Sequence, residues 1–412
     1  MRIFLIHQYA GNKGDRAVAC ALCEMIHSMY KHADIVISTS DPRLWEHDTL
    51  MKQNRVQFIP NAWDFTNISR GNKFYWNLLE KVKKYTFTIL RESYLRGKNR
   101  LFAKAIINPT FYHNVQKADY IISVGGHHFT TLLSRDIVSS INYDAMAVGI
   151  LKKHFVCFSQ SFGPFDFHNK RNKLATINIL KKCKLFPREN QSLKCLKDFL
   201  GETSNIKMTY ESVLTLTSIF HSYIKPSLRE RVIGISVYST QKRTKEKYSC
   251  YVNSISKLCS KVIEKGYKII FFPMELKGSN PDDRPLICEI INKIENKNSC
   301  LLYDKDMDTL EHLQEVSKCC MFIGHKTHST IFALTSGTPL IGIAYHPKTM
   351  EFMKQYDMSE FCIDDRYLTA DTLFEKVCLM ENQMDKIGVC ELVCSRKIAE
   401  IVRKDFKSIF SR

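Results

Sequence analysis

Short runs rich in β-branched and aromatic residues alternate with helix-like segments along almost the whole chain. This alternation is typical of parallel sheets whose strands are joined by helices. The first half holds five such runs: Arg2 to His7, Asp34 to Ser38, Val56 to Ile59, Tyr120 to Val124 and Phe155 to Ser159. The second half holds five more: Val232 to Tyr238, Lys268 to Phe272, Cys300 to Tyr303, Met321 to Ile323 and Leu340 to Tyr345. The pattern predicts an α/β fold of two doubly wound, Rossmann-like domains, with an active site in a cleft facing the carboxyl ends of the strands.

The length of the chain also favours two domains. Its 412 residues exceed what a single hydrophobic core usually organises. The second series of runs begins after the polar segment IKPSLRER. We therefore predict a first domain over residues 1–224 and a second domain over residues 225–385.

The charge of the chain limits the classes of partner. The 60 Lys and Arg against 42 Asp and Glu give a net charge of +18, which favours phosphorylated small molecules, an acidic membrane surface or nucleic acid. Nucleic-acid binding is disfavoured, because the sequence has no helix-turn-helix pattern and no RNA-binding strand signature.

The sequence has no visible signal for export. No segment approaches the ~18 consecutive apolar residues of a membrane helix. The fifteen cysteines are scattered without a repeating framework, which indicates free thiols in a reducing compartment. We expect a soluble, cytoplasmic protein.

One insertion, residues 70–104, breaks the alternation. It carries ten Lys and Arg against two Glu, interleaved with aromatic and aliphatic residues. This composition suits an amphipathic segment on an anionic bilayer or a groove for an extended acidic ligand. A solvated helix pair on the flank of the domain explains it equally well.

Three glycine-containing motifs follow strands of the first half. In HQYAGNKGDRAV, Gly11 and Gly14 allow a tight turn before a helix, and Asn12 and Asp15 can cap that helix or hold a substrate hydroxyl. The motif is not a dinucleotide fingerprint. The other two motifs are SVGGHHFT and FSQSFGPFD, whose candidate contact residues are Gly125, Gly126, Gln160, Ser161 and Gly163.

Two further motifs bring positive charge to strand ends. Arg188 follows a short strand in FPREN and is either a surface charge or a fork for carboxylate or phosphate. In IGHKTHS, Lys326 and His328 precede a helix expected from Ser329, so cationic side chains and a helix N-terminus converge on one anion site. His325 and His328 lack a third ligand at matching spacing, so we predict no metal.

These motifs, in this order, resemble the polysaccharide pyruvyl transferase family. The resemblance runs from GNKGDRAV through SVGGHHF, QSFGPF and PRENQSLKCL to GHKTHSTIFALTSGTPLIGIAYHPKTMEFM. It implies a two-lobed fold similar to B-type glycosyltransferases, with a final helix over Glu391 to Phe410, in a segment 386–412 that packs back on the first domain. Members of the family usually carry Arg-Leu-His where this chain has Lys326, Thr327 and His328.

The resemblance also implies a reaction. The pyruvyl group of phosphoenolpyruvate would move to a sugar diol of a surface or capsular polysaccharide precursor, as a cyclic ketal, with release of phosphate. Arg188 and Lys326 would neutralise the donor, His328 would handle the proton, and Asp15 would act as base. Substrate contacts are expected at Asn12, Gly14, Gly125, Gly126, Gln160, Ser161, Gly163, His325, Ser329, Tyr345 and Lys348. No cofactor is required, and the glycan acceptor is expected to be lipid-linked, with peripheral contact at the inner face of the membrane.

Two other functions compete with pyruvyl transfer. One is a B-type glycosyltransferase that uses a nucleotide sugar, and the other is a non-catalytic member that binds a glycan. Release of phosphate would indicate pyruvyl transfer, whereas release of a nucleotide would indicate a glycosyltransferase.

Overall fold

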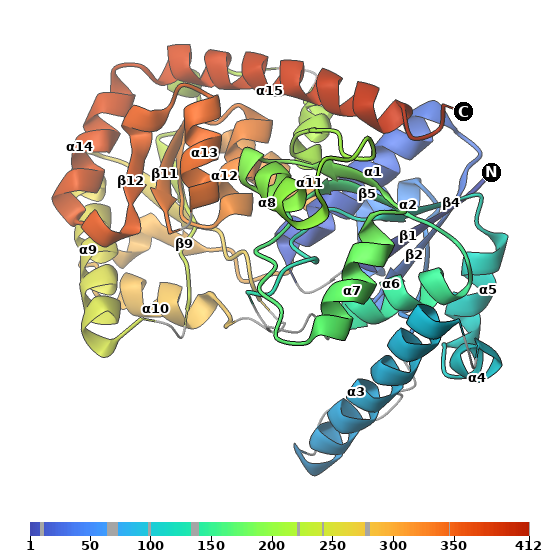
Figure 1. The fold of residues 1–412 in the computed structure, drawn as a ribbon. Helices are drawn as coiled ribbons and strands as arrows, with labels where there is room; N and C mark the ends of the chain where they lie inside the picture. The colour runs from blue at the N-terminus through green and yellow to red at the C-terminus, as the bar shows by residue number, and fades with distance from the viewer. Residues whose placement is uncertain are drawn as a thin grey trace. The chain divides into compact units, whose positions relative to one another are not determined.

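The structure, a computed structural model, describes residues 1–8, 12–63, 73–97, 100–132, 140–220, 223–240, 243–276, 281–345 and 347–411, apart from the side chains of 73–80, 100, 140, 141, 347 and 348. The chain forms two compact units (Figure 1). Unit 1 consists of Met1–Ala10, Val18–Ser212 and Val402–Arg412, and unit 2 of Gly11–Ala17 and Val213–Ile401. The change between the two long segments falls at Ser212 and Val213, whereas the sequence predicts a junction near residue 225.

Unit 1 is built on a six-stranded parallel sheet in the order β3-β2-β1-β4-β5-β6. The strands are β1 (Arg2–Gln8), β2 (Asp34–Thr39), β3 (Gln57–Pro60), β4 (Tyr120–Ser123), β5 (Val156–Gln160) and β6 (Lys184–Pro187). The strand order reverses between β1 and β4, where Ile6 lies opposite Ser123. In a doubly wound sheet, ligands bind outside the carboxyl ends of the strands at such a reversal.

Several helices of unit 1 begin at side-chain caps. The helices of this unit are α2 (Thr49–Gln53), α3 (Lys73–Arg96), α4 (Arg100–Ala105), α5 (Pro109–Lys117), α6 (Ser140–Ile150), α7 (Lys170–Leu180), α8 (Asn190–Leu200) and the greater part of α1 (Lys13–Met29). Asp48, Asn108 and Asn169 each accept hydrogen bonds from backbone N–H groups in the first turn of α2, α5 and α7. Their short polar side chains satisfy N–H groups that have no partner within the helix.

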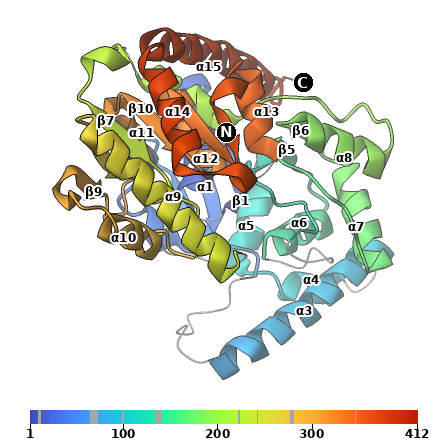
Figure 2. The same cartoon turned by 90° about the vertical axis from the view of Figure 1, so that its left-hand side faces the viewer.

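Unit 2 repeats the same topology, with the strand order β12-β11-β10-β7-β8-β9. Its strands are β7 (Val232–Ile235), β8 (Lys268–Phe271), β9 (Cys300–Leu302), β10 (Met321–Gly324), β11 (Leu340–Ala344) and β12 (Cys362–Asp364). Its helices are α9 (Lys245–Glu264), α10 (Arg284–Asn292), α11 (Thr309–Lys318), α12 (Thr327–Ser336), α13 (Pro347–Gln355), α14 (Ala370–Glu381) and most of α15 (Met384–Lys407). Figure 2 shows α9 and α14 side by side. The order reverses between β7 and β10.

The predicted fold class is confirmed, and all ten predicted β-rich runs form strands. Some elements differ from the prediction. The helix expected from Ser329 begins at Thr327 with Lys326 as its N-cap, so His328 lies in the first turn and does not cap the helix. The strand β12, a three-residue strand at the edge of its sheet, was not predicted.

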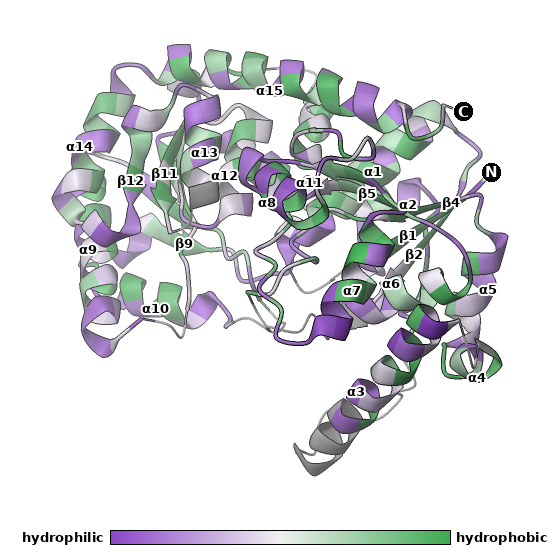
Figure 3. Cartoon of the chain, viewed as in Figure 1, coloured by the Kyte–Doolittle hydropathy of each residue, from purple (hydrophilic) through white to green (hydrophobic). Residues whose placement is uncertain are grey.

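The central strands of each sheet are apolar and buried, as parallel strands covered on both faces must be. Figure 3 shows the strands mostly in green, the colour of hydrophobic residues. In unit 1 the rings of Phe4 on β1 and Phe111 on α5 meet edge to face, with centroids 5.2 Å apart. In unit 2 His312 is buried between Phe272 and Phe332. Burial lowers the pKa of His312 well below its ordinary value, so this histidine is a neutral core residue.

The last residues of the chain belong to unit 1. Phe406 is fully buried against Phe158, with ring centroids 4.8 Å apart, and Phe410 packs on Tyr30 and Tyr120. The helix that carries Phe406, α15, begins at Met384, before the predicted start at Glu391.

No helix among the described residues is both long and apolar enough to cross a bilayer.

Candidate active site

In unit 2, polar side chains gather where β7 and β10 end. Ser236 follows β7, and its hydroxyl accepts the backbone N–H of His325, which follows β10, at 3.2 Å. The same hydroxyl donates to Ser329 Oγ, and Ser329 Oγ donates to the carbonyl of Lys326 at 2.7 Å. Ser329 is fully buried. These bonds fix the turn between β10 and α12, so Ser329 holds the start of the helix in place.

Lys326 at this turn forms a bidentate contact with a buried carboxylate. Its Nζ lies 2.8 Å from each carboxyl oxygen of Asp283. Asp283 also accepts the backbone N–H groups of Met274 and Glu275, at 3.0 and 2.9 Å. The Asp283 side chain is fully buried, and the Lys326 side chain is 12% exposed. Burial raises the pKa of Asp283 above its ordinary value, and the nearby charge of Lys326 opposes part of this shift. The positive charge of Lys326 is therefore already balanced inside unit 2.

The start of α1 belongs to the same cluster. Asn12 forms a bridge with Glu275 and donates through Nδ2 to Glu275 Oε2 at 2.8 Å. Its Oδ1 accepts the N–H groups of Gly14 and Asp15, at 2.8 and 3.3 Å. Of the two roles open from the sequence, Asn12 has that of a helix cap. Asp15, on the first turn of α1, is partly exposed.

A glycine brings α1 against the first turn of α12. A Cβ built on Gly14 would lie 2.0 Å from Cγ of His328 and 2.1 Å from its Nδ1. Real Cβ atoms do not approach other atoms so closely, so only glycine allows the imidazole to lie on this backbone. Gly14 and His328 therefore lie against each other, which is necessary if both belong to one site.

Two basic residues near the start of α1 tie it to unit 2. Lys13 Nζ donates to Asp306 Oδ1 at 3.0 Å and to the carbonyl of Met307 at 2.9 Å. Arg16 Nη1 lies 3.0 and 3.1 Å from the two oxygens of Asp306. Both cations are buried. These contacts explain why Gly11–Ala17 belongs to unit 2.

His325 directly precedes Lys326 in the chain, and its side chain is fully buried. Its Nδ1 is hydrogen-bonded to the hydroxyl of Tyr251 at 2.9 Å, and its Nε2 lies 3.5 Å from Asp365 Oδ1. Burial, with Arg243 and Lys326 nearby, holds the pKa of His325 well below its ordinary value. A neutral imidazole forms no ion pair with Asp365, so His325 supports the site from within the core.

An aromatic pair lies beside His325. The rings of Tyr238 and Tyr345 are 4.3 Å apart, and both contact the imidazole of His325. Tyr345 is 38% exposed. Arg243 stacks on Tyr251 at 4.0 Å from its centroid and donates to the carbonyl of Tyr238. Tyr345 therefore offers an accessible ring edge or face at the end of β11.

In unit 1, the predicted contact residues meet at the reversal between β1 and β4. Gln160 Nε2 donates to Ser123 Oγ and to the carbonyl of Val124, and His7 Nδ1 is hydrogen-bonded to Ser123 Oγ at 2.7 Å. Gln160 is fully buried. Its amide therefore holds neighbouring strand ends together.

The glycines of unit 1 allow close packing at this edge. A Cβ on Gly125 would lie 2.5 Å from the carbonyl oxygen of Ser159, and one on Gly126 would lie 2.5 Å from Nε2 of His128. Gly126 has φ +152° and Gly163 has φ +75°, which a side chain would strain. The Gly126 carbonyl accepts the N–H of Ser161 at 2.8 Å. The two glycine motifs thus meet in one network.

Arg188 joins the same network as half of a buried ion pair. Its Nη1 donates to Glu211 Oε2 at 2.6 Å, and its Nε donates to Ser161 Oγ at 3.1 Å. Both side chains of the pair are almost fully buried. Of the two roles open from the sequence, the surface charge is excluded, and the guanidinium is already engaged by a carboxylate of its own unit.

The predicted residues therefore fall into two groups. Unit 2 gathers Asn12, Gly14, Asp15, His325, Lys326, His328, Ser329 and Tyr345, and unit 1 gathers Gly125, Gly126, Gln160, Ser161, Gly163 and Arg188. The side chain of Lys348 lies outside the described residues. Sequence reasoning missed Asp283, Glu275 and Asp306. For Asp283 a signal exists, because an Asp shortly before a Pro often starts a helix, as in NPDDRP.

Within the described ranges, no three His, Cys, Asp or Glu side chains come together as a metal site.

Two Rossmann-like units with polar residues at the reversals of their strand orders define an α/β fold similar to that of B-type glycosyltransferases. The sequence matches the polysaccharide pyruvyl transferase family over residues 12–347. The chain belongs to this family and is a polysaccharide-modifying transferase. It is 23% identical over 396 residues to the amylovoran biosynthesis protein AmsJ of Erwinia amylovora, covering 92% of this chain and 91% of that protein.

Solved structures share the fold at low sequence identity. The MnaA–UDP structure of S. aureus is 9% identical, with a TM-score of 0.59 over 100% of this chain and 98% of that chain. The UDP-GlcNAc 2-epimerase of Neisseria meningitidis bound to UDP-GlcNAc is 10% identical, with a TM-score of 0.56 over 98% of this chain and 100% of that chain. At such identities the likeness establishes the fold alone.

Proposed function

We propose that this enzyme transfers the pyruvyl group of phosphoenolpyruvate to a sugar diol of a surface or capsular polysaccharide precursor, forming a ketal and releasing phosphate. The observation that carries the proposal is the start of α12, where Lys326, His328 and a helix N-terminus meet Gly14 of α1 in a chain of this family. The biosynthetic role in the name of AmsJ supports a polysaccharide precursor as acceptor.

The donor would bind at the N-terminus of α12. Lys326 is the N-cap of this ten-residue helix, and its side chain makes no capping bond. Backbone N–H groups and the helix dipole then favour an anion at this point. A lysine ammonium has three N–H groups, so Lys326 can contact both oxygens of Asp283 and still donate to the donor carboxylate or phosphate.

The reaction balances with one proton donor. His328 would protonate the methylene carbon of the enol, which makes the neighbouring carbon electrophilic, and a sugar oxygen would attack that carbon. Phosphate then leaves, and the second hydroxyl closes the ketal. The two hydroxyl protons are accounted for by the new methyl group and the departing phosphate. Asp15, on the first turn of α1 and partly exposed, is the proposed base.

The remaining predicted residues keep proposed roles in their own units. Gly126 and Gln160 are proposed acceptor contacts, and Arg188 is a proposed donor contact that would first have to exchange its bond to Glu211. We also propose that the acceptor is lipid-linked and that α3 brings the enzyme to an anionic membrane. Val82 and Tyr85 on the described part of α3 are 43% and 69% exposed beside Lys81 and Lys84.

A second candidate is transfer from a nucleotide sugar. It is favoured by the accessible ring of Tyr345 on Tyr238, which could stack on a base, and by structural relatives solved with UDP or UDP-GlcNAc.

One experiment separates the two donors. The purified enzyme is incubated with an extract of lipid-linked saccharides from the producing cells and with either phosphoenolpyruvate or a mixture of UDP-sugars. Pyruvyl transfer predicts release of phosphate that depends on the extract. Release of UDP without release of phosphate would reject the proposal in favour of glycosyl transfer.

A further inference from the structure

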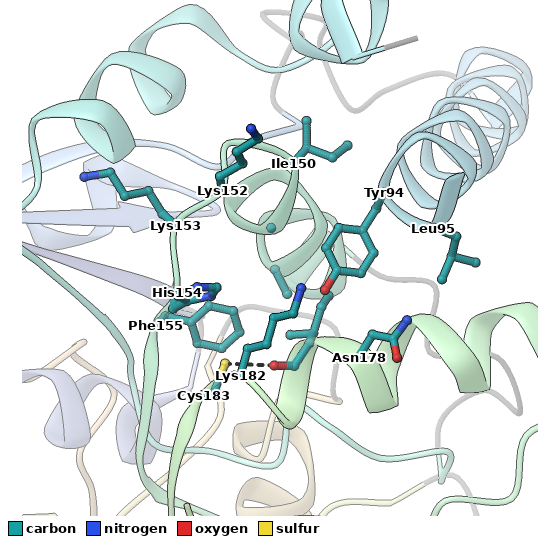
Figure 4. A pocket seen from close by; sticks show the side chains of 13 residues that line it. Tyr94, Leu95, Ile150, Lys152, Lys153, His154, Phe155, Asn178, Lys182 and Cys183 are labelled. Carbon is teal, nitrogen blue, oxygen red and sulfur yellow. Dashed lines mark hydrogen bonds between the residues drawn. The ribbon is translucent and has the colours of Figure 1, made fainter. Parts of the chain in front are cut away.

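Unit 1 has a pocket that is separate from the residues discussed above. Its volume is about 370 Å³, within the range of small-molecule sites. It lies where the C-terminal ends of α3, α6 and α7 meet, and Figure 4 shows its walls. Its lining includes Tyr94, Gly149, Lys152, Lys153, His154 and Lys182.

The pocket lies at the amino ends of the strands. Phe155 comes directly before β5, and Cys183 directly before β6. Gln160 and Arg188 stand at the opposite, carboxyl ends of these strands. The pocket is therefore not part of the candidate active site.

The lining is basic. Among the residues that the structure describes, it includes Lys152, Lys153, Lys182 and His154 but no Asp or Glu. Figure 4 shows Lys182 extending toward the ring of Tyr94, while Lys153 extends away from it. The Lys182 ammonium lies 5.5 Å from the centroid of that ring. The ammonium of Lys182, which follows α7, and the ring of Tyr94 on α3 therefore lie close together at the pocket.

The position of Tyr94 depends on a glycine of α6. A Cβ on Gly149 would lie 2.9 Å from Cε2 of Tyr94, so the ring lies directly on the α6 backbone. Burial raises the pKa of Tyr94 to about 12, so its hydroxyl stays protonated and can donate a hydrogen bond.

A simpler explanation accounts for part of the positive charge around the pocket. Lys152 and Lys153 follow α6, and Lys182 follows α7, and cations near helix C-termini are favourable to the helix dipole. That effect requires neither a cavity nor a tyrosine hydroxyl beside the lysine. It predicts a loss of stability when Lys182 is removed, whereas a binding site predicts a loss of ligand affinity.

We propose that this pocket binds a phosphate-bearing anion through Lys182 and Tyr94, with Lys152 at its rim. The chemistry is common to a soluble phosphorylated metabolite and to the headgroup of an anionic phospholipid. Tyr94 and Leu95 lie on α3, whose described surface exposes Lys81, Lys84 and Tyr85.

The test compares Lys182→Ala and Tyr94→Phe with Lys181→Ala. Lys181 is an exposed neighbour of Lys182 that does not line the pocket. Lys181→Ala therefore makes the same change in charge as Lys182→Ala, but outside the pocket. Calorimetry with glycerol 3-phosphate and with inorganic pyrophosphate should give a Kd weakened about ten- to a hundredfold by Lys182→Ala. Tyr94→Phe should give a smaller, severalfold loss, and Lys181→Ala should match the wild type.

A second arm identifies the source of the phosphate. Co-sedimentation uses vesicles of phosphatidylcholine with or without phosphatidylglycerol. A loss of phosphatidylglycerol-dependent binding in Lys182→Ala and Tyr94→Phe, but not in Lys181→Ala, supports a headgroup. Unchanged vesicle binding with weakened glycerol 3-phosphate binding supports a soluble ligand. Probe and vesicle binding that is equal in all variants, or reduced equally by Lys181→Ala, overturns the proposal.

Discussion

At the scale of single residues, Gly14 sets the position of His328. The imidazole occupies the place of a side chain on Gly14, so Gly14→Ala must push His328 away. We expect Gly14→Ala to lower turnover about a hundredfold or more, as loss of a general acid does. Steady-state phosphate release measures the effect.

The matched control is Gly149→Ala. It also places a methyl group against a ring, that of Tyr94, but at the amino ends of the unit 1 strands. It should leave turnover on a soluble acceptor unchanged. If Gly14→Ala retains wild-type turnover while remaining folded, His328 has no role in the chemistry.

Lys326 and Asp283 should behave as a buried pair. Lys326→Ala leaves the Asp283 carboxylate buried without its cation, which we expect to reduce the free energy of unfolding by about 3–5 kcal/mol. The double variant Lys326→Met with Asp283→Asn should regain most of that loss, because the uncompensated charge is gone. Denaturant unfolding measures both.

The same double variant isolates the donor contact. Stability near that of the wild type with strongly weakened phosphoenolpyruvate binding would assign Lys326 to the donor. Wild-type affinity in the double variant would contradict that role and leave Lys326 as a structural residue.

Asp144 on α6 should make unit 1 less stable as the pH rises. Its carboxyl is fully buried and accepts the N–H of Ala62 at 2.8 Å, and burial raises its pKa to about 8. The unfolded chain releases this proton near pH 4, so from about pH 4 to 8 the folded state binds more protons. The free energy of unfolding should therefore fall through this window, by at most about 1.4 kcal/mol per pH unit.

Asp144→Asn should remove this slope, because the amide still accepts the N–H of Ala62 but does not titrate. Thermal unfolding from pH 5 to 8 measures the difference from the wild type. Asp198→Asn, at an exposed position of α8, is the control and should retain the wild-type slope. A wild-type slope in Asp144→Asn would show that the Asp144 carboxyl is ionised in the folded protein.

At the scale of elements, α3 combines exposed basic and apolar residues. Figure 3 shows purple and green segments alternating along its described part. Lys81→Glu combined with Lys84→Glu should weaken co-sedimentation with anionic vesicles, because each surface lysine contributes about 1 kcal/mol toward such a surface. The effect should shrink as salt is added.

Lys83, which the sequence places in the same basic run, lies 5.9 Å from the ring of Trp63 and is left unchanged in this test. Lys245→Glu with Lys247→Glu, on exposed positions of α9 in unit 2, makes an equal change in net charge. Equal loss of vesicle binding in both double variants would exclude a specific role for α3.

At the scale of the whole molecule, the end of the chain completes the core of unit 1. Phe406 is fully buried against Phe158, and Lys207 pairs with Asp405 at 2.6 Å. Phe406→Ala should reduce the free energy of unfolding of unit 1 by about 3–5 kcal/mol. Urea unfolding followed by near-ultraviolet circular dichroism measures this loss.

Ile401→Ala is the control for Phe406→Ala, because Ile401 lies on the same helix but is 44% exposed. It should change stability only slightly. If both variants unfold alike, the end of α15 contributes little to unit 1.

The sequence by itself determined the architecture. All ten predicted runs form strands, and both sheets have the doubly wound order. Strand and helix periods and strand-end glycines are properties of short windows, so they can be read without knowledge of distant residues. The polar motifs at the strand ends were also found, because parallel strands carry their carboxyl ends to one edge of the sheet.

Only the tertiary structure decided what those polar residues contact. Lys326 meets Asp283 across 43 positions of sequence, and Arg188 meets Glu211 through the packing of separate loops. The same holds for Gly14 beneath His328 and for the first turn of α1 within unit 2. Such pairings depend on the strand order and on the depth of each side chain. A cationic residue that the sequence predicts to lie in an anion site can therefore be half of a buried ion pair in the fold.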